Sequence, residues 1–457
     1  MKQILIIPGN TDLNRGDQAL VWESISLVED VYGKEETRCV LMSELEGEVA
    51  YLQNRQTKEL GYKFVNTLIK HPGRHFTTKV EDSKGYSRLT LLQWGLQALR
   101  DYFHTRPLLS NNKLIQKAGE FFLNKAEINT LNTLKCCDAV FVKGGGFIHS
   151  YGAITDPYFI YFLTYHIRLA EAYGKKVFLL PNSIGPLNNG LAKKIALKAI
   201  KNCDLVTVRE NISKELLLSL GVDAFHFPDL GFYLKPSAKD MRDYLSNKGV
   251  PLKQKKVVIT LRPYRFQGFE SATKLYDNYI NGFVGFVQSL IEKEFHITFM
   301  AHTLGPSTHE DDRIAIKEVL NRLPNGMHKD ISYIEDYDLD CRDVEKIYSY
   351  YDYMIGTRFH SVIFSLNVGV PAIAIAYGGN KSRGIMSVIG NGDFCIDMDK
   401  VQVHTLIEKF DELELCRETY LANLKDKKSI IIEQRKQMID LIRMKQTGNK
   451  NIANTAV

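Results

Sequence analysis

The sequence predicts an α/β fold with two domains, each built around a parallel β-sheet. Its 457 residues exceed the size at which a single hydrophobic core stops growing. In both halves, apolar runs of strand length alternate with stretches of helical periodicity, which is the pattern of βαβ units. The runs are rich in Val, Ile, Leu and Phe with little polar alternation, as a sheet covered by helices on both faces requires.

The predicted N-terminal domain covers residues 1–236 and contains an insertion. Between about residues 47 and 131 the βα rhythm is lost, and many Lys, Arg and His residues lie among scattered Leu and Phe. We expect a helical insertion there, and the sequence leaves its role open. The predicted strands of this domain are residues 3–7, 39–42, 139–143, 176–181, 205–208 and 224–227.

A charged stretch, residues 239–256, leads to the predicted C-terminal domain, residues 250–400. Residues 401–445 follow a helical pattern rich in Leu, Ile, Glu and Lys, so we expect segment 401–457 to form amphipathic helices that pack on the domains. The predicted strands of the second domain are residues 257–261, 297–301, 353–356 and 372–376.

Composition excludes several classes of protein. The net charge of +6 suits an anionic substrate or an anionic membrane face, but no stripe of Lys and Arg with interleaved aromatics indicates nucleic-acid binding. Seven cysteines without repeated CxxC spacing are typical of buried thiols in a reducing compartment. The most apolar later stretch, residues 158–170, is too short to cross a bilayer and carries His166 and Arg168. We therefore expect a cytoplasmic protein without a signal peptide or transmembrane segment.

Ligands of open parallel sheets bind at the carboxyl ends of the strands, so polar residues that follow the predicted strands are the candidate site. Asn14, Arg15, Gly16 and Asp17 follow the first strand. Gly16 permits a tight turn, Asp17 could cap the helix that Gln18 begins, and we expect Asn14 and Arg15 to point into the crevice. A plain loop with a good N-cap explains the same residues.

Three consecutive glycines, Gly144, Gly145 and Gly146, follow the buried strand 139–143. One glycine would suffice for a turn, so we interpret the run as a ligand-facing loop in which the backbone approaches the ligand closely. It is neither a P-loop nor a GxGxxG motif.

Two arginines follow strands of the two halves. Arg209 follows strand 205–208, where its planar fork of donors could bind a carboxylate or phosphate, and a surface ion pair with Glu210 is the alternative. Arg358 and His360 follow strand 353–356 and would share a face if that strand continued through them. The arginine could then bind an anion while the histidine delivers a proton. Each residue singly could instead be structural, as an ion-pair partner or a core histidine.

A metal site is not predicted. His71 and His75, like His302 and His309, lack the spacing of metal ligands, and Pro72 and Gly73 would interrupt a helical pairing of the first two. We expect these histidines on the surface.

Taken in order, these motifs resemble the polysaccharide pyruvyl transferase family. The resemblance runs from Asn14-x-Gly16-Asp17-x-Ala19 through the glycine run, Ile184-Gly185-Pro186, Val208-Arg209-Glu210 and Pro228-Asp229 to Arg358-Phe359-His360 and Gly369-Val370-Pro371. It implies a GT-B-like fold, with two Rossmann-like domains facing across a cleft that holds the active site. It also implies transfer of pyruvate from phosphoenolpyruvate onto two hydroxyls of one sugar, which forms a cyclic ketal.

The resemblance also implies roles for the candidate residues. Arg209, Arg358 and His360 would bind phosphoenolpyruvate, and Phe359, Asn14 and the glycines Gly144, Gly145 and Gly146 would belong to the substrate site. We expect His360 to act as general acid on the vinyl carbon and Asp17 to orient or deprotonate the acceptor hydroxyl. No cofactor or metal is expected. The saccharide acceptor, if lipid-linked, would bring the chain to the inner membrane face as a peripheral protein.

Two other functions fit the same fold. A sugar-nucleotide-dependent glycosyltransferase would also use a cleft, glycine loops and basic groups, and a non-catalytic carbohydrate-binding protein could retain the architecture. The sequence does not identify the acceptor sugar, its hydroxyls, the ketal stereochemistry or the oligomeric state.

Overall fold

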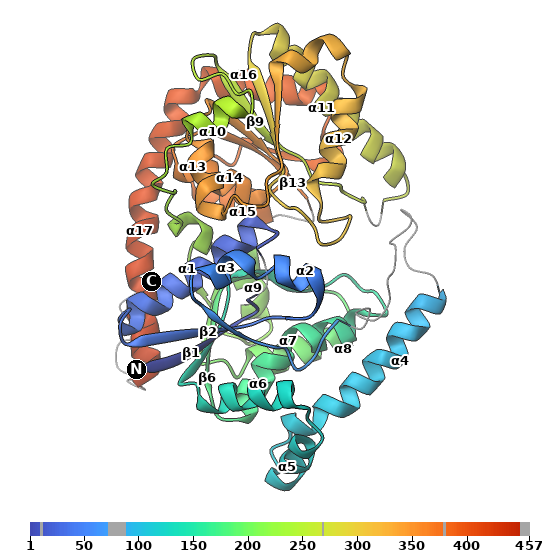
Figure 1. Ribbon diagram of the computed structural model, residues 1–457, viewed down its shortest axis with the longest axis vertical. Coiled ribbons are helices and arrows are strands. Elements are labelled where there is room, and N and C mark those ends of the chain that lie inside the picture. Colours follow the sequence, from blue (N-terminus) through green and yellow to red (C-terminus); the bar gives the residue numbers. More distant parts are fainter. Residues whose placement is uncertain (10–11, 72–87, 267–268, 378–380, 448–457) are drawn as a thin grey trace. The chain divides into compact units, whose positions relative to one another are not determined.

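The computed structural model describes residues 1–9, 12–71, 88–266, 269–377 and 381–447, and these form two compact units (Figure 1). Unit 1 comprises residues 1–12, 20–229 and 434–457, and unit 2 comprises residues 13–19 and 230–433, apart from the undescribed positions. Two parallel sheets, one in each unit, confirm the predicted α/β class.

Unit 1 is built on an eight-stranded parallel sheet of order β3-β2-β1-β4-β6-β7-β8, with β5 paired to β6. The long strand β6 therefore carries two neighbours along one side, β4 and then β5. The strands are β1 Lys2–Ile7, β2 Thr37–Met42, β3 Lys63–Val65, β4 Ala139–Val142, β5 Gly145–Ser150, β6 Lys176–Leu187, β7 Leu205–Val208 and β8 Phe225–His226.

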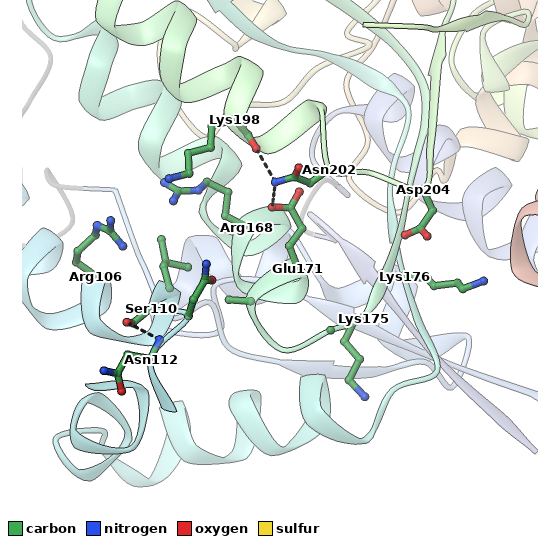
Figure 2. Close-up of a pocket in the computed structure, with 14 residues that line it drawn as sticks. Arg106, Ser110, Asn112, Arg168, Glu171, Lys175, Lys176, Lys198, Asn202 and Asp204 are labelled. Carbon is green, nitrogen blue, oxygen red and sulfur yellow. Dashed lines mark hydrogen bonds between the residues drawn. The ribbon is translucent and has the colours of Figure 1, made fainter. Parts of the chain in front are cut away.

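The helices of unit 1 include those of the predicted insertion, whose middle part, around η1, lines a pocket. The insertion holds α2 Gly47–Leu52, α3 Arg55–Glu59, α4 Arg88–Thr105, η1 Arg106–Leu109, α5 Lys113–Phe121 and α6 Lys125–Cys136. Residues from η1, α7 (Asp156–Ala172) and α8 (Gly190–Ile200) line the pocket, which Figure 2 shows. The remaining helices are α1 Arg15–Tyr32, whose first five residues are counted with unit 2, and α9 Asn211–Ser219.

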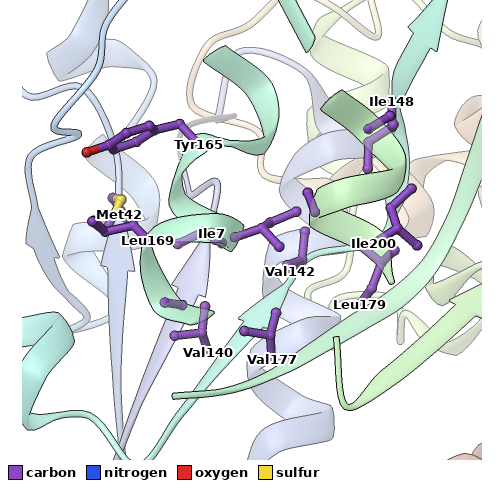
Figure 3. Close-up of a cluster of buried hydrophobic side chains, with 14 of the residues drawn as sticks. Ile7, Met42, Val140, Val142, Ile148, Tyr165, Leu169, Val177, Leu179 and Ile200 are labelled. Carbon is purple, nitrogen blue, oxygen red and sulfur yellow. The ribbon is translucent and has the colours of Figure 1, made fainter. Parts of the chain in front are cut away.

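A continuous hydrophobic cluster joins the sheet of unit 1 to the helices on one of its faces (Figure 3). Alternate residues of β4 and β6, such as Val140 and Leu179, point into it. Leu169 of α7 and Ile200 of α8 pack against them, and all four side chains are fully buried. Burial on this scale accounts for the continuous apolar runs that predicted the strands.

Unit 2 is built on a six-stranded parallel sheet of order β11-β10-β9-β12-β13-β14. Its strands are β9 Lys256–Thr260, β10 His296–Met300, β11 Ile331–Ile334, β12 Tyr353–Gly356, β13 Ala372–Ala376 and β14 Cys395–Asp397. Its helices are η2 Leu230–Tyr233, α10 Arg242–Asn247, α11 Ala272–Glu292, α12 Asp312–Arg322, η3 Asn325–Asp330, α13 Cys341–Tyr348, α14 Phe359–Asn367, α15 Lys381–Val388, η4 Met398–Lys400 and α16 Val403–Leu415. The C-terminal helix α17, Arg417–Thr447, contributes residues to both units.

The structure differs from the prediction at four strands that the sequence pattern did not reveal, β3, β5, β11 and β14. Three of them lie at sheet edges or are only three residues long, so their apolar runs are short. The fourth, β5, begins at Gly145, so Gly145 and Gly146 are not a loop as predicted. They open a strand whose Gly145 is in register with Asn182 of β6.

The cysteines and helices bear on two further expectations. All seven cysteines are free thiols, but the expectation of buried thiols is wrong for Cys136, which is exposed on the last turn of α6. Among the helices within the described ranges, none combines the length and apolar composition needed to cross a bilayer.

Candidate functional site

The best-defined group of candidate residues lies in unit 2, where β12 gives way to α14. The strand ends at Gly356, and α14 begins at Phe359 with Arg358 in the N-cap position. The strand does not continue through Arg358 and His360, so the condition under which they would share a strand face is not met. Instead, Arg358 occupies the N-cap position and His360 lies in the first turn of the helix, directly after the half-buried Phe359.

Arg358 is buried in a pair of ion pairs and keeps one unused donor. Its Nε donates to Oδ1 of Asp312 at 2.7 Å, and its Nη1 donates to Oε2 of Glu310 at 2.9 Å. Burial acts to lower the pKa of Arg358, but the two carboxylates outweigh it and hold that pKa above its ordinary value. Its Nη2 is buried and has no hydrogen-bond partner among the described residues. A buried charged donor without a partner is costly, so a ligand atom is its expected partner.

Asp312, the first residue of α12, fixes the orientation of Arg358. Its Oδ2 accepts the backbone N–H groups of His302 at 3.0 Å and Thr303 at 2.9 Å, while Oδ1 accepts from Arg358. Burial raises the pKa of Asp312 to about 6, although the Arg358 guanidinium favours the charged form. The carboxyl group is therefore ionised at neutral pH and is neutralised in mild acid.

The segment 13–19 belongs to unit 2, where its backbone pairs with residues 302–304, which follow β10. The Arg15 N–H donates to the His302 carbonyl at 3.2 Å, and the Leu304 N–H donates to the Leu13 carbonyl at 2.8 Å. Arg15 does not point into a crevice as predicted, because its side chain is buried and its Nη2 donates to the Asp336 carbonyl at 3.1 Å. This arginine is structural.

The N-cap of α1 is Asn14 and not Asp17, which corrects the predicted cap. Oδ1 of Asn14 accepts the N–H groups of Gly16 at 3.1 Å and Asp17 at 3.3 Å. Asp17 lies inside the first turn, half-buried, and its Oδ2 accepts from Nδ2 of Asn14 at 2.9 Å. The carboxylate at the helix N-terminus is thus held in a defined position.

Gly16 and His360 are in direct contact. A Cβ atom at position 16 would lie 2.4 Å from Nδ1 of His360, so only glycine leaves room for this imidazole. The first turns of α1 and α14 therefore approach each other at this point, and Asn14, Gly16, Arg358 and His360 belong to one region of unit 2.

His302 is a member of this region that the sequence analysis placed wrongly on the surface. It is 1% exposed, and its Nδ1 lies 3.3 Å from the Tyr348 hydroxyl. Burial, followed by the nearby His360 and Arg358, holds its pKa well below the ordinary value, so His302 is neutral. Its Nε2 is buried without a hydrogen-bond partner among the described residues. Apart from its position after a strand, nothing in the sequence distinguishes His302 as a site residue.

Arg262 is a second residue that the sequence analysis missed. It lies two residues after β9, and its Nη2 is 3.7 Å from Oε1 of Glu310, the carboxylate that also holds Arg358. Its guanidinium carbon lies 4.0 Å from the centre of the Tyr377 ring, a cation–π contact. Arg209 was selected from the sequence because it follows a predicted strand. The same criterion would have identified Arg262.

Arg209, in unit 1, is held by buried partners. Its Nε donates to Oγ of Ser183 at 2.7 Å, and its Nη1 donates to Oδ2 of Asp229, which is fully buried. Its carboxylate partner at short range is therefore Asp229, while Glu210 is 3.9 Å away. The alternative of a surface ion pair with Glu210 does not describe this residue.

The glycine run lies in unit 1 beside a buried amide. Nδ2 of Asn182 donates to the Lys143 carbonyl at 2.9 Å, and its Oδ1 is buried without a hydrogen-bond partner in the described part of the chain. A Cβ atom at Gly145 would lie 3.9 Å from that oxygen, and Gly145 has a φ of +147°, which favours glycine. Contact between Gly144, Gly145 or Gly146 and a substrate stays a prediction.

Over the described ranges, His, Cys, Asp and Glu side chains form no group of three or more that could ligate a metal. The candidate residues thus divide into those of unit 2, which are Asn14, Gly16, Asp17, Arg358, Phe359 and His360 with the added His302 and Arg262, and those of unit 1, which are Arg209 and the glycine run.

Comparisons with known proteins agree with this reading. The model of the family described as polysaccharide pyruvyl transferase matches residues 14–379. The amylovoran biosynthesis protein AmsJ of Erwinia amylovora is 24% identical over 317 residues, which is 65% of this chain and 73% of that protein.

Solved structures with this fold are remote in sequence. A UDP-N-acetylglucosamine 2-epimerase of Listeria monocytogenes, described as putative, is 13% identical, covers 100% of this chain and 99% of its own, and has a TM-score of 0.56. UGT2 of Phytolacca americana, in a complex with UDP-2-fluoro-glucose and pterostilbene, is 10% identical, covers 98% of this chain and 100% of its own, and has a TM-score of 0.53. Such identities establish the fold alone, which is GT-B-like with two Rossmann-like units, as predicted.

Proposed function

Because the chain belongs to the polysaccharide pyruvyl transferase family, we propose that it transfers a pyruvyl group from phosphoenolpyruvate to two hydroxyls of one sugar of a cell-surface polysaccharide. Its likeness to AmsJ supports a place in polysaccharide biosynthesis. The donor and the position of the residues around it are the parts of the proposal that need testing.

The unused donor of Arg358 is the observation that carries the proposal. Phosphoenolpyruvate bears a carboxylate and a phosphate, and a guanidinium binds either group through planar, charge-assisted hydrogen bonds. Asp312 and Glu310 already fix two of the arginine nitrogens, so Nη2 is presented in one orientation without loss of side-chain entropy on binding. His302 is neutral and buried next to it, and its Nε2 is a second group that could contact the donor.

His360 supplies the proton in the proposed reaction. It donates a proton to the methylene carbon of phosphoenolpyruvate while the first sugar hydroxyl attacks C2, and that hydroxyl loses its own proton to a base. Phosphate then leaves from C2 with the electrons of its C–O bond, and the second hydroxyl adds to C2 and loses its proton to the now neutral His360, which closes the ketal ring. The contact with Gly16 restricts the imidazole to one side of α1, which holds the acid in place.

Asp17 is our candidate for the base that accepts the hydroxyl proton. Its carboxylate lies in the first turn of the helix whose backbone contacts His360, and its bond from Asn14 orients it. Arg209, by the family resemblance, is a further ligand of phosphoenolpyruvate. Its guanidinium is oriented by Ser183 and Asp229 in the same manner as Arg358 is by its carboxylates.

The test is release of phosphate from phosphoenolpyruvate in the presence of a panel of saccharide acceptors, with the ketal identified by mass spectrometry. Calorimetric titration with phosphoenolpyruvate and with UDP-sugars separates the proposal from its main rival. Binding of UDP-sugars without phosphoenolpyruvate would identify a glycosyltransferase instead. Binding of saccharides alone, without turnover, would identify a carbohydrate-binding protein.

A further inference from the structure

Among the described residues, helix α4 buries one face against unit 1. Trp94 is buried on that face, and Oγ1 of Thr105 lies 3.1 Å from the Tyr161 hydroxyl of α7. The Tyr158 hydroxyl, also on α7, donates to Oδ2 of Asp101 at 3.4 Å. These contacts anchor α4 at the periphery of unit 1, where Figure 1 shows it as the light-blue helix.

The opposite face of α4 carries a row of exposed apolar side chains, which we call the apolar stripe. Successive members are three or four residues apart, so they lie along one side of the helix. Each is between 59% and 68% exposed, so the row forms a continuous exposed apolar strip. The stripe consists of Leu89, Leu92, Leu96, Leu99 and Phe103.

A pocket with unpaired cations begins where the stripe ends. Arg106 follows Phe103 by one turn and lines a pocket of about 780 Å³ together with Arg168 of α7 and Lys198 of α8 (Figure 2). In the described part of the chain these three cationic side chains have no hydrogen bond and no ion pair. We call the pocket lined by these side chains the basic pocket.

The basic pocket carries more positive than negative charge, because Arg106, Arg168, Lys175, Lys176 and Lys198 line it together with only Glu171 and Asp204. Burial lowers the pKa of Arg168, and the neighbouring Arg106 lowers it further. Of the two acidic groups in the lining, Glu171 is a weak counter-charge, because burial raises its pKa to about 7 and Asp204 adds to this effect. The other charged neighbours of Glu171 are Arg168 and Lys198. An anion bound in the pocket would relieve the repulsion among the cationic side chains.

The surrounding segment has the composition of an interfacial membrane element. Residues 88–122 contain five Arg or Lys residues and two acidic residues, and α5 adds further exposed apolar groups beyond the pocket. Basic residues beside a Leu- and Phe-rich face are typical of helices that lie in the plane of a bilayer surface. The added apolar groups are Leu114, Ile115, Phe121 and Phe122.

We propose that the apolar stripe and the basic pocket form one docking surface for an anionic lipid bilayer. The stripe enters the region between headgroups and acyl chains, and Arg106, Arg168 and Lys198 bind lipid phosphate groups. The spacing of the stripe would also suit pairing with a second copy of the chain. Such a pairing would leave the cations of the basic pocket without counter-charge, so the charges favour the lipid surface.

The test is flotation of the full chain with vesicles of phosphatidylcholine alone and with added phosphatidylglycerol. We expect binding to the anionic vesicles only. The double variant Leu92→Gln/Leu96→Gln should weaken that binding by at least about tenfold, because two apolar side chains no longer leave water. Lys198→Gln should weaken binding to the anionic vesicles by about fivefold. Raised salt should weaken this binding for the unaltered chain and for every variant.

Two variants provide matched controls, and neither alters the docking surface. Leu218→Gln replaces a leucine of α9 that is 64% exposed, and Lys274→Gln replaces an exposed lysine of α11, so both should bind vesicles as the unaltered chain does. Unchanged unfolding temperatures would show that all variants fold.

Several results would overturn the proposal. Equal binding to neutral and anionic vesicles, or wild-type binding by the double variant, would remove the role of the basic pocket or of the stripe. A dimer that the double variant abolishes, without vesicle binding, would assign the stripe to a second copy. Inorganic pyrophosphate bound through Lys198, again without vesicle binding, would assign the pocket to a soluble anion. None of these readouts depends on phosphoenolpyruvate turnover.

Discussion

The imidazole of His360 lies against the backbone of Gly16 so closely that a Cβ atom at position 16 would come within 2.4 Å of Nδ1. Gly16→Ala should therefore displace the imidazole while leaving the helix intact, since alanine favours a helix. We expect turnover to fall by about a hundredfold, as a displaced catalytic group does. Gly190→Ala, at the start of α8 with nothing within 4 Å, is the matched control and should be active. Equal activity of the two variants would show that the position of His360 is not critical.

His360→Ala should abolish general acid catalysis without preventing donor binding. We expect turnover to fall by about two to four orders of magnitude, with the affinity for phosphoenolpyruvate largely kept. Phosphate release measures the first quantity and calorimetry the second. His404→Ala, an exposed histidine of α16, should behave as the unaltered chain does. Near-normal turnover of His360→Ala would refute the assigned role.

Arg358→Lys should lose donor affinity although it keeps the charge. A lysine cannot bond Asp312, Glu310 and a ligand through one planar group, so we expect the dissociation constant of phosphoenolpyruvate to rise at least about tenfold. Arg322→Lys, on α12 and paired with the exposed Asp277, is the control. Retained affinity in Arg358→Lys would contradict donor binding by Arg358.

The pH dependence of donor binding should report Asp312. Its pKa, raised to about 6 by burial, means that the carboxylate which orients Arg358 is present above pH 6 and is lost as the pH falls through that value. We expect kcat/KM for phosphoenolpyruvate to decline below about pH 6. Asp312→Asn should be less active and should lack this part of the decline. An unchanged acid limb in Asp312→Asn would assign it to another group.

Arg209→Lys separates a substrate role from a structural one. If Arg209 binds phosphoenolpyruvate, the folded variant should show a KM at least about tenfold higher, because the planar donor fork is lost. If Arg209 serves only to pair with Asp229 and Ser183, the unfolding temperature should fall while KM stays constant. Steady-state kinetics and thermal unfolding of the same preparation decide between these outcomes.

Much of the α/β fold could be predicted because buried parallel strands are continuous apolar runs. Leu205–Val208, Tyr353–Gly356 and Ala372–Ala376 have the bounds that their runs predict. Among the short strands at sheet edges, β8 was predicted but β3, β11 and β14 were not, because three residues such as Cys395–Asp397 form no recognisable run. The sequence also indicated Arg209, Arg358 and His360 through their places after strands.

What the sequence by itself determined is local, namely which runs are strands and which polar residues follow them. Tertiary structure alone decided that residues 13–19 join unit 2, that His302 is buried beside His360, and that α14 starts before His360. The physical reason is that these features depend on backbone pairing and close packing with segments that are not adjacent in the sequence. Such contacts leave no periodic pattern along the chain.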